Sequence, residues 1–357
     1  MLYEIAEKAA ALENEGKKII KFNIGDPDQL TPKEVIEAAY ESMKKGKTKY
    51  STSAGEKNLK EALASIHGVQ EDNIVITAGS KWGIFAVMSL LLKKGGNLII
   101  PTPHWTAYDL IARNFGAEVR FLRTELDSNW EINIKKLEAL IDDETKIIVL
   151  NNPNNPTCKV LREKTVKEIV QTAETHGVTV LSDEVYADIS FVQTKSVLDI
   201  SSNHVVVKSF SKTFAMTGWR VGYVIAKKEL VDKIVKLNQI TLTNIPVFIQ
   251  EAALKALELR HQIIQKIREE YFRRSELACK ILSKADLKFS KPEAPFYLFP
   301  KREGLNSEEF AFKLLEKGVA ITPGTAFGDY REHFRLSLTV PNEDLELGLK
   351  IISEALG

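Results

Sequence analysis

Short apolar runs alternate along most of the chain with longer stretches in which apolar residues recur at helical spacing. Runs of about four to eight residues are typical of buried strands, and longer periodic stretches are typical of amphipathic helices. The predicted strands are Ile74–Thr77, Asn97–Ile100, Glu118–Leu122, Lys146–Leu150, Thr179–Ser182 and Val205–Ser209. The helices predicted between them are Lys81–Leu92, Trp105–Phe115, Ile134–Leu140, Glu163–His176 and Lys228–Leu237. This alternation predicts an α/β fold with a mostly parallel sheet covered on both faces.

The two ends of the chain have patterns of their own. A helix is predicted over Pro32–Lys45 with Thr31 as its N-cap, and a long charged helix from about Pro246 to Lys284. In the last part of the chain, short apolar runs and helical stretches alternate again: Phe296–Phe299, Ser307–Lys317, Phe334–Ser337 and Asn342–Ala355. Because 357 residues are too many for one small core, we expect two domains. Residues 41–260 would form the large one, and residues 1–40 with 261–357 a smaller α/β domain.

Composition narrows the possible partners and the compartment. The chain has 49 basic and 48 acidic residues, so its charge gives no reason to expect nucleic acid or a membrane surface as a partner. The longest apolar run, Trp82–Leu92, is far shorter than the roughly 20 residues of a membrane helix. The first residues lack the apolar stretch of a signal peptide, so we expect a cytoplasmic protein. Two cysteines and six scattered histidines make neither a disulfide framework nor a metal site, although one bridge stays possible.

Candidate chemistry gathers just after the predicted strands, where ligands bind in parallel sheets. Lys212 follows the strand Val205–Ser209, and Arg220 comes eight residues later. A partly desolvated lysine beside other cations loses its proton and becomes a nucleophile. The hydroxyl of Ser209 and the guanidinium of Arg220 suit a phosphate group. This segment therefore predicts a reactive lysine next to a bound phosphate.

The ends of other predicted strands carry polar and aromatic side chains that could bind the ring of a cofactor. Asp183 follows the strand Thr179–Ser182, and a carboxylate there can keep a heteroaromatic ring nitrogen protonated. Tyr186 and Asn155 can donate hydrogen bonds to an oxygen on such a ring, and Trp105 offers a flat face for stacking. Ala78-Gly-Ser-Lys81 opens a helix whose free backbone N–H groups would bind an anion.

Together these segments resemble the class I/II aminotransferases of pyridoxal-phosphate (PLP) fold type I. Nine motifs occur in the family's order: Asn23–Asp28, Lys49–Gly55, Ala78–Lys81, Pro103–Trp105, Asn155–Thr157, Ser182–Tyr186, Ser209–Lys212, Gly218–Gly222 and Phe334–Ser337. The resemblance runs from about residue 5 to the C-terminus. It implies a large domain with a seven-stranded-type sheet between helices and a smaller domain built from both termini.

The resemblance also implies a role for each matching residue. Lys212 looks like the lysine that forms a Schiff base with PLP, and Asp183 like the partner of its pyridine nitrogen. Tyr186 and Asn155 would bind the phenolate oxygen, and Trp105 would stack on the ring. The phosphate would be bound by Gly79, Ser80, Ser209 and Arg220, and in a homodimer with shared active sites by Tyr50 of the neighbouring subunit. Arg335, helped by Asn155 and the Gly25 backbone, would bind the substrate α-carboxylate.

One departure concerns Cys158, where the family usually has glycine, so we expect the turn after Thr157 to differ slightly. No metal is expected.

The resemblance implies transfer of an amino group from an amino acid to a 2-oxo acid by ping-pong kinetics. Lys81 matches a lysine that assists with the distal carboxylate in one subgroup of aspartate aminotransferases, although it could equally neutralise the phosphate. We therefore expect aspartate and 2-oxoglutarate as substrates. Alanine or aromatic substrates stay open, and so does a carbon–sulfur β-lyase, since such lyases keep the same motifs.

Overall fold

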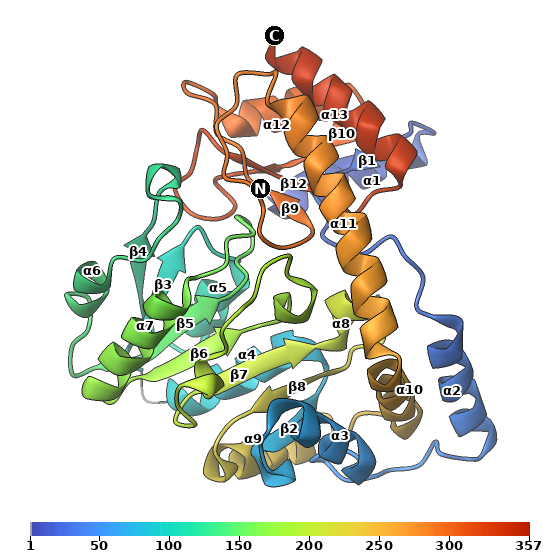
Figure 1. The fold of residues 1–357 in the computed structure, drawn as a ribbon, viewed down its shortest axis with the longest axis vertical. Helices are drawn as coiled ribbons and strands as arrows, with labels where there is room; N and C mark the ends of the chain where they lie inside the picture. The colour runs from blue at the N-terminus through green and yellow to red at the C-terminus, as the bar shows by residue number, and fades with distance from the viewer. Residues whose placement is uncertain (1, 94) are drawn as a thin grey trace.

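A computed structural model of the protein describes residues 2–93 and 95–357. Its centre is a seven-stranded sheet of order β2-β8-β7-β6-β5-β3-β4 (Figure 1). The strands are β2 (Ile74–Thr77), β3 (Asn97–Thr102), β4 (Glu118–Arg123), β5 (Thr145–Asn151), β6 (Thr179–Asp183), β7 (Val205–Ser209) and β8 (Gly222–Ile225). Strands β3 to β7 pair in parallel, and β8 pairs antiparallel with both β2 and β7. The predicted mostly parallel α/β sheet is confirmed.

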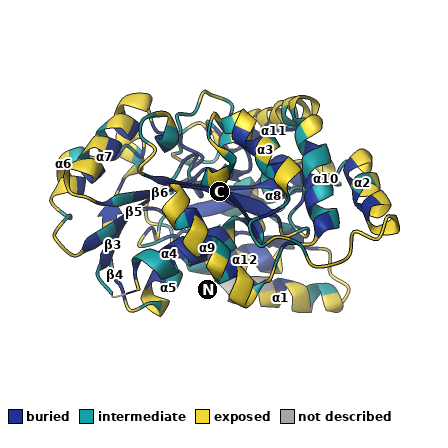
Figure 2. Ribbon diagram, turned by 90° about the horizontal axis from the view of Figure 1, so that it is seen from below, coloured by how far each residue is buried: buried dark blue, intermediate teal, exposed yellow. Residues whose placement is uncertain are grey.

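Alternate residues of the central strands bury opposite faces of this sheet. In β5, Ile148 and Leu150 belong to one apolar cluster, and Ile147 and Val149 belong to another. Successive side chains of a strand point to opposite faces, so both faces need a covering layer. One layer consists of α4 (Gly79–Leu91), α5 (Ala107–Asn114) and α9 (Lys228–Thr241). The other includes α2 (Lys33–Lys44), α3 (Lys57–His67), α6 (Ile134–Glu138), α7 (Glu163–Thr175) and α10 (Val247–Glu258). Figure 2 shows the buried sheet between helices with exposed outer faces.

Both ends of the chain contribute to a second, smaller α/β unit (Figure 1). Ile20 of the N-terminal part pairs in parallel with Val319, so the two ends share a small sheet. The elements are α1 (Leu2–Asn14), β1 (Ile20–Lys21), α11 (Arg260–Leu282), β9 (Tyr297–Leu298), α12 (Ser307–Glu316), β10 (Val319–Ala320), β11 (Thr322–Pro323), β12 (Phe334–Ser337) and α13 (Asn342–Leu356). This confirms the smaller α/β unit from both termini, whereas the boundaries at residues 40 and 260 stay predictions.

Two details of the predicted helices are wrong. The single helix from Pro246 to Lys284 is broken at Leu259 into α10 and α11, because the two segments bury their apolar faces in different cores. Thr31 does not cap α2; its hydroxyl instead donates a hydrogen bond to the Ala215 carbonyl (2.6 Å), and Pro32 occupies the cap position. In the part of the chain that the structure describes, no helix combines the length and apolar character needed to span a bilayer.

Candidate active site

Lys212 lies at the carboxyl end of β7, on the short helix α8 (Phe210–Thr213). Its Nζ donates a hydrogen bond to the carbonyl oxygen of Gly25. Burial lowers the pKa of Lys212 to about 8, although the negative charge of Asp26 acts to raise it. Three neighbouring cations add to this lowering of the pKa: Arg335, Arg220 and Lys81. The site therefore contains an amine that gives up its proton more readily than a solvated lysine does.

Asp183 lies at the end of β6, one strand away from Lys212 in the sheet, and is buried. Its Oδ2 accepts a hydrogen bond from the Tyr108 hydroxyl (2.7 Å), and its Oδ1 accepts one from the Val185 N–H (3.3 Å). Burial raises the pKa of Asp183 to about 6, although both hydrogen bonds lower it. The carboxylate is thus mostly ionised at neutral pH. Tyr108 on α5 was not among the predicted site residues.

Arg335 reaches the site from β12 and is buried. Its Nη1 donates to Asn155 Oδ1 (3.1 Å) and its Nη2 donates to the Asn23 carbonyl (2.7 Å). The guanidinium also lies over two rings, 4.5 Å from the centroid of Tyr297 and 5.0 Å from that of Phe327. Its Nε is buried and has no hydrogen-bond partner among the described residues. The fold therefore brings the predicted carboxylate-binding pair Arg335 and Asn155 together, with one donor still to be satisfied.

Tyr297 on β9 is a site residue that the sequence reasoning missed. Its hydroxyl lies 3.1 Å from the hydroxyl of Tyr186. A Cβ atom added to Gly25 would lie 2.1 Å from the same hydroxyl, so only glycine fits there without displacing Tyr297. The contact requires the Tyr297 side chain to lie close to the Gly25 backbone and cannot be read from local sequence. Gly25 is therefore needed for space as well as for its backbone groups.

Cys158 adopts a left-handed backbone conformation (φ +53°), which ordinarily favours glycine. Its thiol donates a hydrogen bond to the Pro295 carbonyl (3.1 Å) and accepts one from the Tyr297 N–H (3.3 Å). The side chain thus ties the turn after Thr157 to the strand that carries Tyr297.

The start of α4 and Arg220 form a candidate anion site. A Cβ at Gly79 would lie 2.6 Å from Arg220 Nη2, so glycine allows the guanidinium to approach the helix start. Arg220 donates to the Thr217 carbonyl (2.7 Å) and the Ala78 carbonyl (3.3 Å). No side chain caps α4, which leaves its first N–H groups available for an anion. At the start of α8, the hydroxyl of Ser209 donates a hydrogen bond to that of Ser211 (2.9 Å).

Trp105 and Lys81 lie beside this anion site. The indole of Trp105 meets the ring of Tyr108 in a T-shaped arrangement, with 5.4 Å between the ring centroids. Lys81 Nζ lies 5.0 Å from the centroid of the Trp105 indole.

A cavity of about 340 Å³ joins most of the predicted residues. Eight of them line it: Gly25, Ser80, Trp105, Asn155, Asp183, Tyr186, Lys212 and Arg335. The lining also includes Tyr108 and Tyr297. Tyr50 is not brought to this cavity and is 88% exposed. No group of three or more potential metal ligands occurs within residues 2–93 and 95–357.

The family model for "Aminotransferase class I and II" matches residues 17–352 of this chain. The chain belongs to this aminotransferase family. The resemblance seen in the sequence motifs is thus confirmed over nearly the whole chain, and the protein is a transaminase.

Individual relatives agree with this assignment. The aspartate aminotransferase of Thermococcus kodakarensis is 38% identical over 96% of this chain and 90% of its own length. A (5-formylfuran-3-yl)methyl phosphate transaminase of Methanocaldococcus jannaschii is 34% identical over 99% of this chain and 95% of its own. Among solved structures, aspartate aminotransferase from Thermus thermophilus with maleate has a TM-score of 0.94 at 29% identity, covering 99% of this chain and 96% of that one. The chain is therefore similar to transaminases whose substrates differ.

Proposed function

We propose that this aminotransferase binds PLP at Lys212 and transfers the amino group of aspartate to 2-oxoglutarate. The observation that carries the proposal is one cavity lined by a lysine of lowered pKa, a buried carboxylate and a buried arginine with a free donor. The lysine would react with an aldehyde, the carboxylate would pair with a protonated pyridine nitrogen, and the arginine would bind a substrate carboxylate. The names of two relatives, both aspartate aminotransferases, support the choice of substrate.

The donor set fits the cofactor. Gly79, Ser80 and Arg220 would bind the phosphate at the uncapped start of α4, and the hydroxyl of Ser209 would add a further donor. Asp183 would pair with the pyridine nitrogen, and Tyr186 with Asn155 would donate to the phenolate oxygen. When bound, PLP supplies an aldehyde and a ring that absorbs the electron pair left after loss of the substrate α-proton.

The protein's own groups would then perform three tasks. Arg335 would bind the α-carboxylate of the amino acid in a bidentate pair, giving up its present contacts with Asn23 or Asn155. The Lys212 amine has a pKa of about 8 and is therefore neutral at higher pH. It would take the α-proton at Nζ and return it as a general acid. Asp183 would hold the proton on the ring nitrogen, because its carboxylate is buried and ionised.

Lys81 is the candidate residue for recognition of the distal carboxylate. Its ammonium lies 5.0 Å from the centroid of the Trp105 indole, and Trp105 lines the cavity. We expect Lys81→Ala to lose at least about tenfold in kcat/KM for aspartate, since a charge-assisted contact is worth about 1.5–3 kcal/mol. Alanine, which has no distal carboxylate, serves as the matched control substrate. Equal losses on the two substrates would assign Lys81 to the cofactor phosphate instead.

The kinetic pattern tests the reaction type. With aspartate and 2-oxoglutarate varied together, double-reciprocal plots should give parallel lines, because the first product leaves before the second substrate binds. Intersecting lines would contradict the proposed order. Release of pyruvate from a sulfur-containing amino acid in the absence of any 2-oxo acid would favour the β-lyase alternative.

A homodimer with shared active sites is also part of the proposal. Tyr50 is almost fully exposed, as expected for a residue that acts on another subunit. Exposed apolar side chains also surround a surface hollow next to Asp26 and Pro27: Leu30, Ile36, Tyr40 and Met43. Such a patch favours an interface. Sedimentation equilibrium should give twice the 40.1 kDa chain mass, and a monomer that is active would contradict the shared site.

A further inference from the structure

The segment of residues 23–28, called here the strap, crosses the site and contacts both of its key cations through backbone oxygens. The Gly25 carbonyl accepts a hydrogen bond from Lys212 Nζ, and the Asn23 carbonyl accepts one from Arg335 Nη2 at 2.7 Å. Small displacements of the strap would therefore change the surroundings of the amine and of the guanidinium together. What holds the strap in place thus bears directly on substrate binding.

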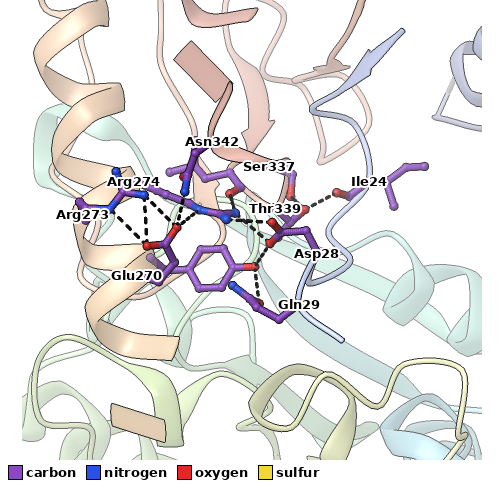
Figure 3. A network of polar contacts seen from close by, with 11 residues as sticks. Ile24, Asp28, Gln29, Glu270, Arg273, Arg274, Ser337, Thr339 and Asn342 are labelled. Atoms are coloured by element: carbon purple, nitrogen blue, oxygen red, sulfur yellow. Dashed lines mark hydrogen bonds and ion pairs between the residues drawn. The ribbon is translucent and has the colours of Figure 1, made fainter. Parts of the chain in front are cut away.

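The far end of the strap is anchored by buried side chains of α11, chiefly that of Arg274. Arg274 on α11 forms a bidentate pair with Asp28, with Nη1–Oδ1 at 2.9 Å and Nη2–Oδ2 at 2.8 Å (Figure 3). The Arg274 side chain is only 4% exposed. The Tyr271 hydroxyl donates a further hydrogen bond to the same carboxylate (3.1 Å). A bidentate pair of this kind fixes orientation as well as distance.

The same guanidinium also binds the segment that follows the strand of Arg335. Arg274 Nη1 donates to the Leu338 carbonyl (3.0 Å), and its Nε donates to Glu270 Oε1 (2.8 Å). One residue further on, the Thr339 hydroxyl donates to the Ile24 carbonyl of the strap (2.9 Å), as Figure 3 shows. Arg274 therefore joins three elements: α11, the strap and the end of β12.

We propose that Arg274 is a positioning residue that fixes the strap over Lys212 and Arg335 and thereby sets the enzyme's affinity for substrate carboxylates. This role rests on the proposed function, because it assumes that Arg335 binds the carboxylate. Arg274 does not line the cavity and touches no reacting atom. It acts through Asp28, whose backbone continues into Gly25 and Asn23.

The proposal predicts that geometry matters more than charge. Lysine keeps the positive charge at position 274 but cannot donate two parallel hydrogen bonds to Asp28 and a third to Leu338. We expect Arg274→Lys to raise KM for both the amino acid and the 2-oxo acid by about 10- to 100-fold, since a misplacement of about 1 Å can have an effect of that size. The kcat at saturating substrate should change less, because the hydrogen bonds of Asp183 with Tyr108 and Val185 and the backbone of Lys212 on α8 do not involve the strap.

Arg273→Met is the matched control. Arg273 is the neighbouring residue on α11 and is 54% exposed, and its hydrogen bonds and ion pair go to the same Glu270, at 2.9 Å, rather than to the strap (Figure 3). It should leave both KM values unchanged. Asp28→Asn is the second test variant, because it removes the carboxylate from the strap while Arg274 keeps Glu270 and Leu338 as partners. It should reproduce the rise in KM even where the Arg274 variant fails to fold.

Hydrogen exchange in substrate-free protein supplies a readout independent of catalysis. Amides of the strap should exchange faster in Arg274→Lys and Asp28→Asn than in the parent and in Arg273→Met. Unchanged exchange of the strap in the folded variants, or unchanged KM values, would overturn the proposal. If the parent itself does not transaminate aspartate, the proposed substrate fails, and the exchange comparison alone decides the role of Arg274.

Discussion

Two lysines that lie four residues apart at the carboxyl end of β7, Lys208 buried and Lys212 partly buried, have pKa values shifted in opposite directions. Burial alone would lower the pKa of Lys208, but the charge of Asp188 and smaller contributions from Tyr223 and Glu184 raise it above its ordinary value. Its Nζ pairs with Asp188 Oδ1 at 2.7 Å. Burial lowers the pKa of Lys212 to about 8, and there the nearest acceptor is a carbonyl oxygen.

The comparison teaches that burial does not by itself make a lysine reactive. Burial disfavours the charged form of both amines, yet the carboxylate partner keeps Lys208 charged. Lys212 faces Arg335 and Arg220 instead, and these cations disfavour its protonated form. A Schiff-base lysine thus requires an environment that withholds an ion partner.

The largest effect is expected from removing the reactive amine. Lys212→Ala should lose at least about 10²–10⁴-fold in kcat, because its Nζ is the proposed general base and acid. Lys208→Met removes an amine that is even more buried and should keep most of the activity of the folded enzyme. Comparable losses in steady-state assays of the two variants would break the distinction between the lysines.

The ion pair of Lys208 should instead affect stability. Asp188→Asn leaves the buried ammonium without its partner and should lower the free energy of unfolding by about 1–3 kcal/mol, less than for a fully buried pair because Asp188 is 37% exposed. Since the folded pKa of Lys208 is raised, this stabilisation is complete below about pH 10.4 and is lost only as the pH rises further. Urea denaturation at pH 7 measures it. An unchanged unfolding free energy would show that the charge of Lys208 needs no partner.

The pH dependence of labelling sharpens the contrast between the lysines. In cofactor-free protein, reductive labelling by a small aldehyde should reach half its maximal rate at Lys212 near pH 8 and decline at lower pH, where the amine is protonated. Lys208 should stay unlabelled over the same range. Peptide mass analysis distinguishes the two sites. A midpoint near the ordinary lysine value of about 10.4 would contradict the lowered pKa.

The smallest effect concerns Asp26, whose carboxylate opposes this lowering of the Lys212 pKa. Asp26→Asn should lower the labelling midpoint of Lys212 further, because the charge of Asp26 raises its pKa. Arg335→Met should move the midpoint the other way, since that cation lowers the pKa. The same labelling experiment serves both variants, and midpoints that move in the same direction would show that charge does not control this amine.

Much of the large sheet could be predicted from the sequence, because most of its strands are buried and lie between segments of clear helical periodicity. β2 and β7 have the predicted bounds. β8 was not predicted, since it is only four residues long and starts at a glycine. The two-residue strands β1, β10 and β11 are too short for any periodicity. The break at Leu259 has no glycine or proline to mark it, so α10 and α11 read as one helix.

The site was predictable where its residues follow strands in recognisable motifs, as for Lys212, Asp183 and Asn155. Tyr108 and Tyr297 were missed because their roles depend on contacts across elements, the first with Asp183 and the second with Tyr186. The anchoring of the strap by Arg274 was missed for the same reason: 246 residues separate it from Asp28. Sequence spacing carries no information about such contacts.

The most direct test is the absorbance spectrum of the purified protein with PLP, recorded before and after addition of aspartate. The account predicts a yellow absorbance band from a Schiff base of PLP. Borohydride should reduce this Schiff base and leave the cofactor covalently attached to Lys212. Without borohydride, aspartate should convert the yellow band to the absorbance of the pyridoxamine form. A protein that stays colourless with PLP, or whose cofactor is fixed at a residue other than Lys212, would contradict the central claim.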